Sequence, residues 1–101
     1  MLDLQQLETF RIVAERRNFT RAAADLGCSQ PTVTTQIKAL ERELGVALFV
    51  RWRFSREVVL TEVGRRTLGY AVRLLRLAAR AKAAAHEDFR PAHSRVQSKR
   101  K

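Results

Sequence analysis

Two helical patterns meet at Gly27 with only a tight turn between them. The first is the short run RAAADL, with Thr20 as its expected N-cap, and the face it buries would consist largely of alanine. The second begins at the N-cap Ser29 and continues to about Leu44, where Gly45 ends it. A helix, a tight turn and a helix in this order form the arrangement that places one helix in the major groove of DNA.

Three positions around the turn carry the residue types that such a motif requires. Ala23 is small where the two helices touch, Gly27 permits the chain to reverse, and Val33 is the aliphatic residue that locks the second helix against the first. Any helical hairpin that ends in glycine can show the same three residues. The triplet alone therefore leaves both interpretations open.

The segments on either side of this pair complete a small domain. An apolar pattern from Asp3 to about Arg17 predicts a first helix. Beyond the helix pair, the β-prone runs Leu48–Val50 and Val58–Leu60 predict two short strands, and the loop between them is rich in arginine. We therefore expect a mainly α fold: a winged helix-turn-helix of three helices and a two-stranded wing, which a long helix follows.

The long helix begins at the N-cap Thr61 and reaches at least Ala85. Its apolar residues cover about half of the helix circumference, interrupted by Lys82. A small domain can hardly cover all of a helix of about 25 residues, so we expect much of this arc to pair with a second copy of the chain. The residues expected in this dimer contact are Leu68, Ala71, Leu74, Leu75, Ala78 and Ala81.

The net charge of +10 lies entirely in the second half of the chain, because the first fifty residues are neutral overall. This imbalance favours a polyanionic partner, either nucleic acid or an anionic membrane surface, although a solubilising surface would look the same. The longest strictly apolar run, Val46–Val50, is far shorter than the roughly 20 residues of a membrane span. With a single cysteine, Cys28, and no signal-peptide pattern at the start, we expect a cytoplasmic protein without a membrane partner.

Several spaced motifs then agree with one family. They are Ser-Gln-Pro at residues 29–31, Ile-x-x-Leu-Glu at 37–41, Leu-Gly-x-x-Leu-Phe-x-Arg at 44–51 and Leu-Thr-x-x-Gly at 60–64. Over residues 2 to about 85, the sequence resembles the N-terminal DNA-binding domain of LysR-type transcriptional regulators. The resemblance implies a winged helix-turn-helix, a long linker helix that dimerises, and sequence-specific binding of an inverted-repeat operator in double-stranded DNA that controls transcription.

The resemblance also assigns residues to DNA. The start of the second helix of the pair would meet base edges and nearby phosphates, because Gln pairs well with adenine and a Thr methyl packs on thymine. Lys38 is the better phosphate candidate further along, and Arg51 matches the wing arginine of the family. The full set is Ser29, Gln30, Pro31, Thr32, Thr34, Thr35, Gln36, Lys38, Arg51, Arg53 and Arg56. A solvated helix face is the alternative for each polar residue on the helix.

Two departures from the family pattern bear on the target sequence. Thr35 stands where the family commonly has Arg, so one expected contact is shorter and uncharged. The wing is longer than usual and contains Trp52 and Phe54, which would stack on the base of the wing or press against the sugar-phosphate backbone. Arg53 and Arg56 would then contact phosphates.

The chain is expected to have three parts: a winged helix-turn-helix DNA-binding domain in residues 1–61, a linker or dimerisation helix in 62–87, and a basic, disordered tail in 88–101. Members of the family carry a larger effector-binding domain after the linker helix. A small-molecule effector would therefore act only through a domain absent from this chain. Two other functions stay open: a truncated regulator that pairs through its last helix with a full-length relative, and a basic protein that binds nucleic acid without sequence preference.

Catalytic material is scarce. The sequence has no Gly-rich phosphate loop and no Ser, His and Asp set, so we expect no enzyme and no cofactor. His86, Glu87, Asp88 and His93 lie at a fraying helix end with no thiolate nearby, and we expect no metal site there.

Overall fold

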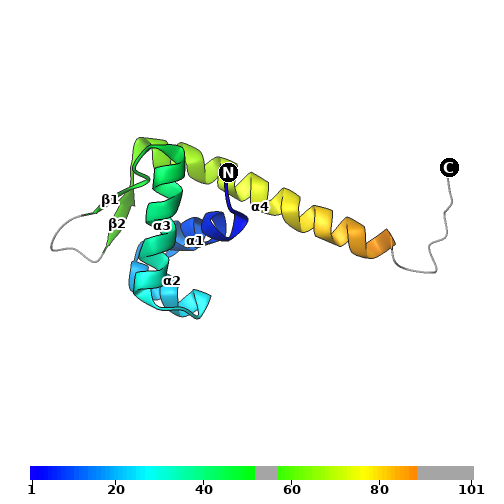
Figure 1. The fold of residues 1–101 in the computed structure, drawn as a ribbon, viewed down its shortest axis with the longest axis horizontal. Helices are drawn as coiled ribbons and strands as arrows, with labels where there is room; N and C mark the ends of the chain where they lie inside the picture. The colour runs from blue at the N-terminus through cyan, green and yellow to red at the C-terminus, as the bar shows by residue number, and fades with distance from the viewer. Residues whose placement is uncertain (52–56, 89–101) are drawn as a thin grey trace.

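The computed structural model describes residues 1–51 and 57–88 (Figure 1), and the side chains of Arg51 and Asp88 are not described. It contains four helices and one antiparallel pair of strands. Their bounds are α1 (Leu4–Arg16), α2 (Phe19–Leu26), α3 (Gln30–Leu44), β1 (Phe49–Arg51), β2 (Val58–Leu60) and α4 (Glu62–Asp88). The expected fold class, a winged helix-turn-helix followed by a long helix, is confirmed. The expectations for Trp52, Arg53, Phe54, Arg56 and the tail lie outside the described residues.

Each helix begins at a side chain that accepts a hydrogen bond from a backbone N–H group of its first turn. Ser29 accepts from the N–H of Thr32 at 3.2 Å, and Thr61 accepts from that of Gly64 at 2.9 Å. The prediction for α2 was wrong by two residues, because its N-cap is Asn18 and not Thr20. Asn18 is extended, with φ −161°, and its side-chain oxygen accepts from the N–H of Arg21 at 2.9 Å. The side-chain amide of Asn18 therefore starts α2 two residues before the position that the hydroxyl of Thr20 would give.

The core lies where α1 meets all the other helices. Phe10 on α1 is fully buried and meets the ring of Phe49 on β1 edge-on, with ring centroids 5.5 Å apart. Phe19 at the start of α2 packs on the same ring of Phe49, with centroids 6.2 Å apart. The remaining buried hydrophobic side chains of the core are Leu7, Val13, Ala22, Ala23, Val33, Ile37, Leu40, Leu48, Val58 and Ala71. One cluster thus holds the helix pair, the wing and the start of α4 together.

The turn between α2 and α3 has the geometry that its sequence predicts. Gly27 is left-handed, with φ 71°, and the N–H of Cys28 returns to the carbonyl of Ala23 at 3.0 Å. Ala23 and Val33 are buried on either side of the turn. The packing of α2 against α3 therefore depends on the small Ala23, the positive φ of Gly27 and the buried aliphatic side chain of Val33.

The wing strands pair Phe49 with Leu60, Val50 with Val59 and Arg51 with Val58. The first strand begins one residue later than expected. The N–H of Leu48 donates to the carboxylate of Glu41 on α3 at 2.8 Å, so Leu48 is tied to the helix before the ladder begins.

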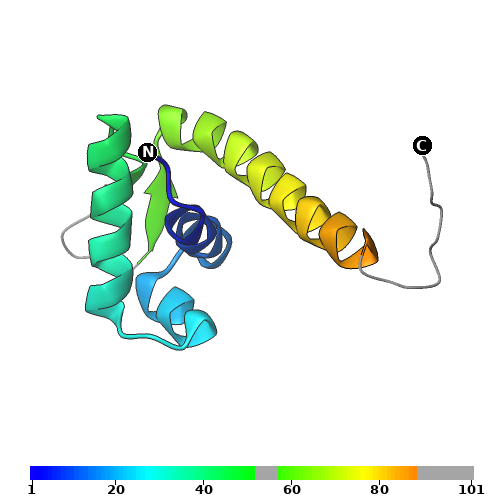
Figure 2. The ribbon, with the colours of Figure 1, turned by 45° about the vertical axis from the view of Figure 1, so that its right-hand side comes forward.

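The long helix α4 packs on the domain only over its first half. Ala71 is 1% exposed and contributes to the core, and Leu68 and Leu75 pack against the same cluster. The second half of α4 then projects away from the domain (Figures 1 and 2). At Gly64 the helix approaches the backbone of Leu48 closely, because a Cβ there would lie 2.1 Å from the backbone oxygen of Leu48.

Candidate nucleic-acid interface

The outer face of α3 consists of polar side chains. Val33, Ile37 and Leu40 are buried, so the opposite side of the helix points away from the core. Figure 2 shows α3 along one edge of the domain, with α4 leaving from the other side. The exposed residues of this outer face are Pro31, Thr32, Thr35, Lys38 and Arg42. We call these five residues the α3 outer face.

The start of α3 is shaped by hydrogen bonds within the chain. The hydroxyls of Ser29 and Thr32 lie 2.9 Å apart, in addition to the capping bond between them. The hydroxyl of Thr20 on α2 donates to the side-chain oxygen of Gln30 at 3.1 Å. This contact occupies the oxygen of the Gln30 side-chain amide. Within the described part of the chain, its NH2 group is left for a partner.

Two of the predicted contact residues lie at the borders of this face. Thr34 and Gln36 are half-buried. The side-chain oxygen of Gln36 accepts a hydrogen bond from the hydroxyl of Thr9, which is 0% exposed on α1. Gln36 therefore joins α3 to α1, and the expectation that its whole side chain faces DNA is corrected. Its position directly before the buried Ile37 places it at the edge of the core.

The electrostatics of α3 favour an anion along its outer face. Lys38 and Arg42 are exposed one turn apart, whereas the acidic residues nearby have other partners. Glu41 accepts the N–H of Leu48, and Glu43 lies 2.7 Å from the N-terminal ammonium group of Met1. Arg42 is not among the residues predicted from the sequence, which end at Lys38 on this helix. The signal for Arg42 was its spacing of four residues from Lys38.

The base of the wing is fixed to the end of α1. Arg17 has a left-handed backbone, with φ 56°, and its carbonyl accepts the N–H of Val58 at 3.1 Å. An isolated bridge joins Asn18 to Glu57 beside it. Arg51 is the last residue of β1 and not part of the loop, and its contacts stay a prediction. Arg53 and Arg56 are outside the described residues.

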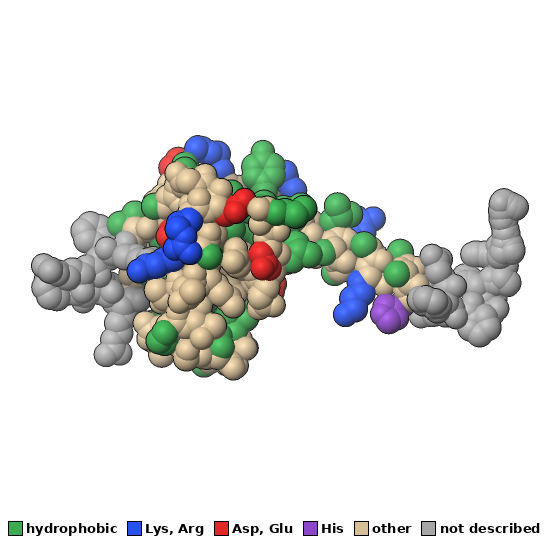
Figure 3. Space-filling model, in the orientation of Figure 1, with side chains coloured by type: hydrophobic (Ala, Val, Ile, Leu, Met, Phe, Trp, Pro, Cys, Tyr) green, Lys and Arg blue, Asp and Glu red, His purple; other side chains and the backbone are tan. Residues whose placement is uncertain are grey.

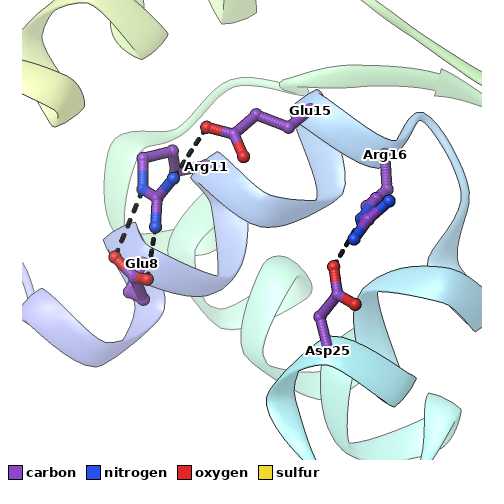
Figure 4. A network of polar contacts seen from close by, with 5 residues as sticks. All are labelled: Glu8, Arg11, Glu15, Arg16 and Asp25. Atoms are coloured by element: carbon purple, nitrogen blue, oxygen red, sulfur yellow. Dashed lines mark hydrogen bonds and ion pairs between the residues drawn. The ribbon is translucent and has the colours of Figure 1, made fainter.

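A network of ion pairs braces α1 and α2 behind this site (Figure 4). Arg11 lies between Glu8 and Glu15 on α1, with N–O distances of 2.5 and 2.7 Å, and Arg16 pairs with Asp25 on α2. The hydrogen bond that Arg11 donates to the Glu8 carboxylate, aided by Glu15, raises the pKa of Arg11. The Asp25 carboxylate, which accepts a hydrogen bond from Arg16, raises the pKa of Arg16. These arginines are engaged with carboxylates and are not available to a phosphate in this arrangement.

The exposed apolar residues of α4 form a second candidate interface. Tyr70 and Leu77 are each 62% exposed, Leu74 is 40% exposed, and Ala81 and Ala84 are exposed beyond them. They alternate in steps of four and three residues, which is the spacing of a helix-pairing seam. We call these five residues the outer strip. Figure 3 shows hydrophobic side chains together with Lys and Arg along the projecting part of α4.

The predicted dimer residues divide between two faces of α4. Leu74 and Ala81 belong to the outer strip, and Leu68, Leu75 and Ala78 are half-buried. The expectation that Ala71 faces a second copy is wrong, because Ala71 is buried in the domain itself. Tyr70 and Leu77 were missed. The seam spacing and the absence of a charged residue from the outer strip could have identified them, since Lys82 interrupts the inner face.

In the part of the chain that the structure describes, no helix combines the length and the apolarity that a membrane span requires. Within the same residues, no group of three or more His, Cys, Asp or Glu side chains is arranged to hold a metal ion.

The sequence matches known transcriptional regulators. BudR of Raoultella terrigena, an HTH-type transcriptional regulator, is 54% identical over 63 residues, which are 62% of this chain and 21% of BudR. The RuBisCO operon transcriptional regulator of Allochromatium vinosum is 44% identical over 70 residues, which are 69% of this chain and 22% of that protein. The chain thus spans about a fifth of the length of these curated relatives.

The fold also matches solved structures, at lower sequence identities. The CbnR DBD–DNA complex has a TM-score of 0.82 and 39% identity, and the match covers 88% of this chain and 100% of that chain. The complex of the BenM DBD with catB site 1 DNA has a TM-score of 0.84 and 33% identity, covering 93% of this chain and 99% of that chain. The family model described as "Bacterial regulatory helix-turn-helix protein, lysR family" matches residues 4–65. The chain therefore belongs to the lysR family of bacterial regulatory helix-turn-helix proteins.

Proposed function

We propose that this chain is the sequence-specific DNA-binding domain of a LysR-type transcriptional regulator and that α3 is its recognition helix. The observation that carries the proposal is the α3 outer face. It is polar and cationic, it is left uncovered by the described residues, and the core holds it rigidly from behind. The matching fold in the CbnR DBD–DNA complex supports the same reading.

The start of α3 would read bases. Gln30 has its side-chain oxygen on Thr20, which leaves its NH2 group to donate to an acceptor such as adenine N7. Ser29, Pro31, Thr32, Thr34 and Thr35 surround it on the first turns, and the threonine methyl groups suit thymine. These residues would therefore carry the sequence preference.

The cations would hold the sugar-phosphate backbone. Lys38 and Arg42 lie further along α3, and the wing arginines Arg51, Arg53 and Arg56 would reach phosphates beside the major groove. Phosphate contacts of this kind contribute affinity without reading sequence. If about 6–10 phosphates are neutralised, affinity should fall about 10³–10⁵-fold between about 50 and 200 mM salt.

The outer strip of α4 would pair two copies. A two-fold pair of domains requires an inverted-repeat operator whose half-sites lie one or more helical turns apart. Such a regulator would act in the cytoplasm, where bacterial DNA is found. The proposal concerns only the DNA-binding part, and an effector would act through a domain outside these residues.

Selection from a random duplex library at physiological salt tests the proposal directly. We expect an enriched inverted repeat, and we expect the Gln30→Ala, Thr32→Ala variant to lose about 1–3 kcal/mol of discrimination per good base contact. Gln5→Ala is the matched control, because Gln5 is an exposed residue of α1 and not of α3. Binding without any enrichment would indicate a non-specific basic protein. Poor DNA binding with tight pairing to a full-length relative would indicate a dimerisation partner.

A further inference from the structure

One edge of the outer strip on α4 is a row of arginines. Arg66, Arg73 and Arg80 recur every seven residues beside the strip, whereas Ala71 and Ala78 occupy its other edge. Positions that flank a helix-pairing seam set the choice and orientation of the partner. The two edges therefore differ in kind: one is small and partly covered by the domain, and the other is cationic and exposed.

Two of the three arginines in this row have no acidic partner in the described part of the chain. The guanidinium group of Arg73 lies 5.5 Å from the ring centroid of Tyr70, and Arg80 is exposed without an ion pair among those residues. Arg66, by contrast, lies 3.6 Å from Glu62. Arg73 and Arg80 thus have no carboxylate beside them, among the described residues, at the edge of the proposed contact.

The sizes of the strip residues favour an antiparallel pair. In that arrangement Leu74 meets the partner's Leu77 at the centre, and the large Tyr70 meets the partner's small Ala81. A parallel pair would place tyrosine against tyrosine at one end and alanine against alanine at the other. The helices would then have to separate at one layer and leave a void at another.

The antiparallel pair brings like charges together. In this arrangement the arginine edge of one helix lies beside the arginine edge of its partner. Arg73 then lies opposite the partner's Arg80, and the two-fold symmetry gives two such pairs. Arg66 faces the partner's Glu87. We propose that repulsion between Arg73 and the partner's Arg80 weakens self-association, so that this dimer tightens as ionic strength rises. The inference rests on the proposed dimer. The proposed salt dependence of dimerisation is opposite in sign to that of DNA binding, which salt weakens.

Sedimentation equilibrium of the full chain tests the sign of the salt dependence of dimerisation. Raising KCl from about 50 to 500 mM screens exposed charges, and the dimer dissociation constant should fall about threefold. Arg80→Glu creates two attractive pairs in place of two repulsive ones, and the dimer should tighten about tenfold at low salt and weaken as salt rises. Arg76→Glu is the matched control, because it changes the charge equally on the solvent face beside the same helix turns.

A double variant separates pairing from net charge. Arg73→Glu together with Arg80→Glu restores like-charge pairs, now between carboxylates, so its own dimer should be weaker than that of Arg80→Glu alone. Mixed with the unmodified chain, it should form more heterodimer than the half that random exchange gives, as native mass spectrometry would record.

The outcomes divide cleanly. A dimer whose dissociation constant responds neither to salt nor to Arg80→Glu, or responds equally to Arg76→Glu, would overturn the inference and leave the proposed dimer intact. A chain that stays monomeric in every variant and at every salt concentration would overturn both. A dimer that is tighter in the double variant than in Arg80→Glu alone would also contradict the pairing of Arg73 with the partner's Arg80. The affinity would then follow the net charge of the chain alone.

Discussion

The buried hydroxyl of Thr9 on α1 donates a hydrogen bond to the side-chain oxygen of Gln36 on α3. These two residues lie 27 positions apart in the sequence, and their contact is a polar link between α1 and α3. Together with the buried Val33, Ile37 and Leu40, it restricts the rotation of α3 about its own axis. It therefore helps to decide which residues of α3 point outward.

Thr9→Val should lower the free energy of unfolding by about 1 kcal/mol, because it removes one hydrogen bond while keeping the shape of the side chain. Urea denaturation monitored by circular dichroism measures this change. Thr35→Val is the matched control: Thr35 is exposed on α3, and the same replacement there should stay within about 0.5 kcal/mol. Equal effects at both positions would show that the link contributes no stability.

Gly64→Ala should destabilise the fold, because the new Cβ would lie 2.1 Å from the backbone oxygen of Leu48. Overpacking of this kind costs about 1–3 kcal/mol, more than the helix propensity that alanine adds. Gly69→Ala serves as control, since nothing lies within 4 Å of a Cβ at that site. There the substitution should raise stability by about 0.5–1 kcal/mol. Thermal unfolding of the two variants compares them, and a stable Gly64→Ala protein would contradict the close approach of α4 to the wing.

Local chemistry predicted much of the fold. The helix caps made by Ser29, Gly27 and Thr61 involve backbone groups within a few residues, so these caps can be read from the sequence. The N-cap of α2 was misplaced because Asn18 and Thr20 are both good capping residues. The choice between them depends on how the chain leaves α1.

The errors at the candidate interfaces have a different cause. A helix wheel shows that α4 has an apolar arc, but the domain decides which part of it is covered, and that decision buries Ala71 while leaving Tyr70 and Leu77 exposed. Gln36 is a polar residue of α3, the proposed recognition helix, yet its hydrogen-bond partner lies on α1. Contacts between distant segments leave no periodic pattern in a single sequence.

Lys38→Ala and Arg42→Ala should each weaken binding to operator and scrambled DNA alike, because phosphate contacts do not depend on base sequence. The slope of log K against log salt should also become shallower by about one unit per variant. Fluorescence anisotropy over a salt series gives both quantities. Arg76→Ala removes the same charge from the solvent face of α4 and should leave the slope nearly unchanged. A loss confined to operator DNA would instead assign these residues to base reading.

Leu77→Lys should convert the proposed dimer into a folded monomer. Leu77 is 62% exposed in the single chain, so lysine there costs the domain little, whereas in a pair it would bury two charges in the central layer of the outer strip. Ala83→Lys is the control, because Ala83 is also exposed on the projecting part of α4 but lies off the strip. Sedimentation velocity with circular dichroism distinguishes loss of the dimer from loss of the fold. A Leu77→Lys protein that still sediments as a dimer would place the contact on another surface, since no arrangement of the outer strip leaves Leu77 outside the pair.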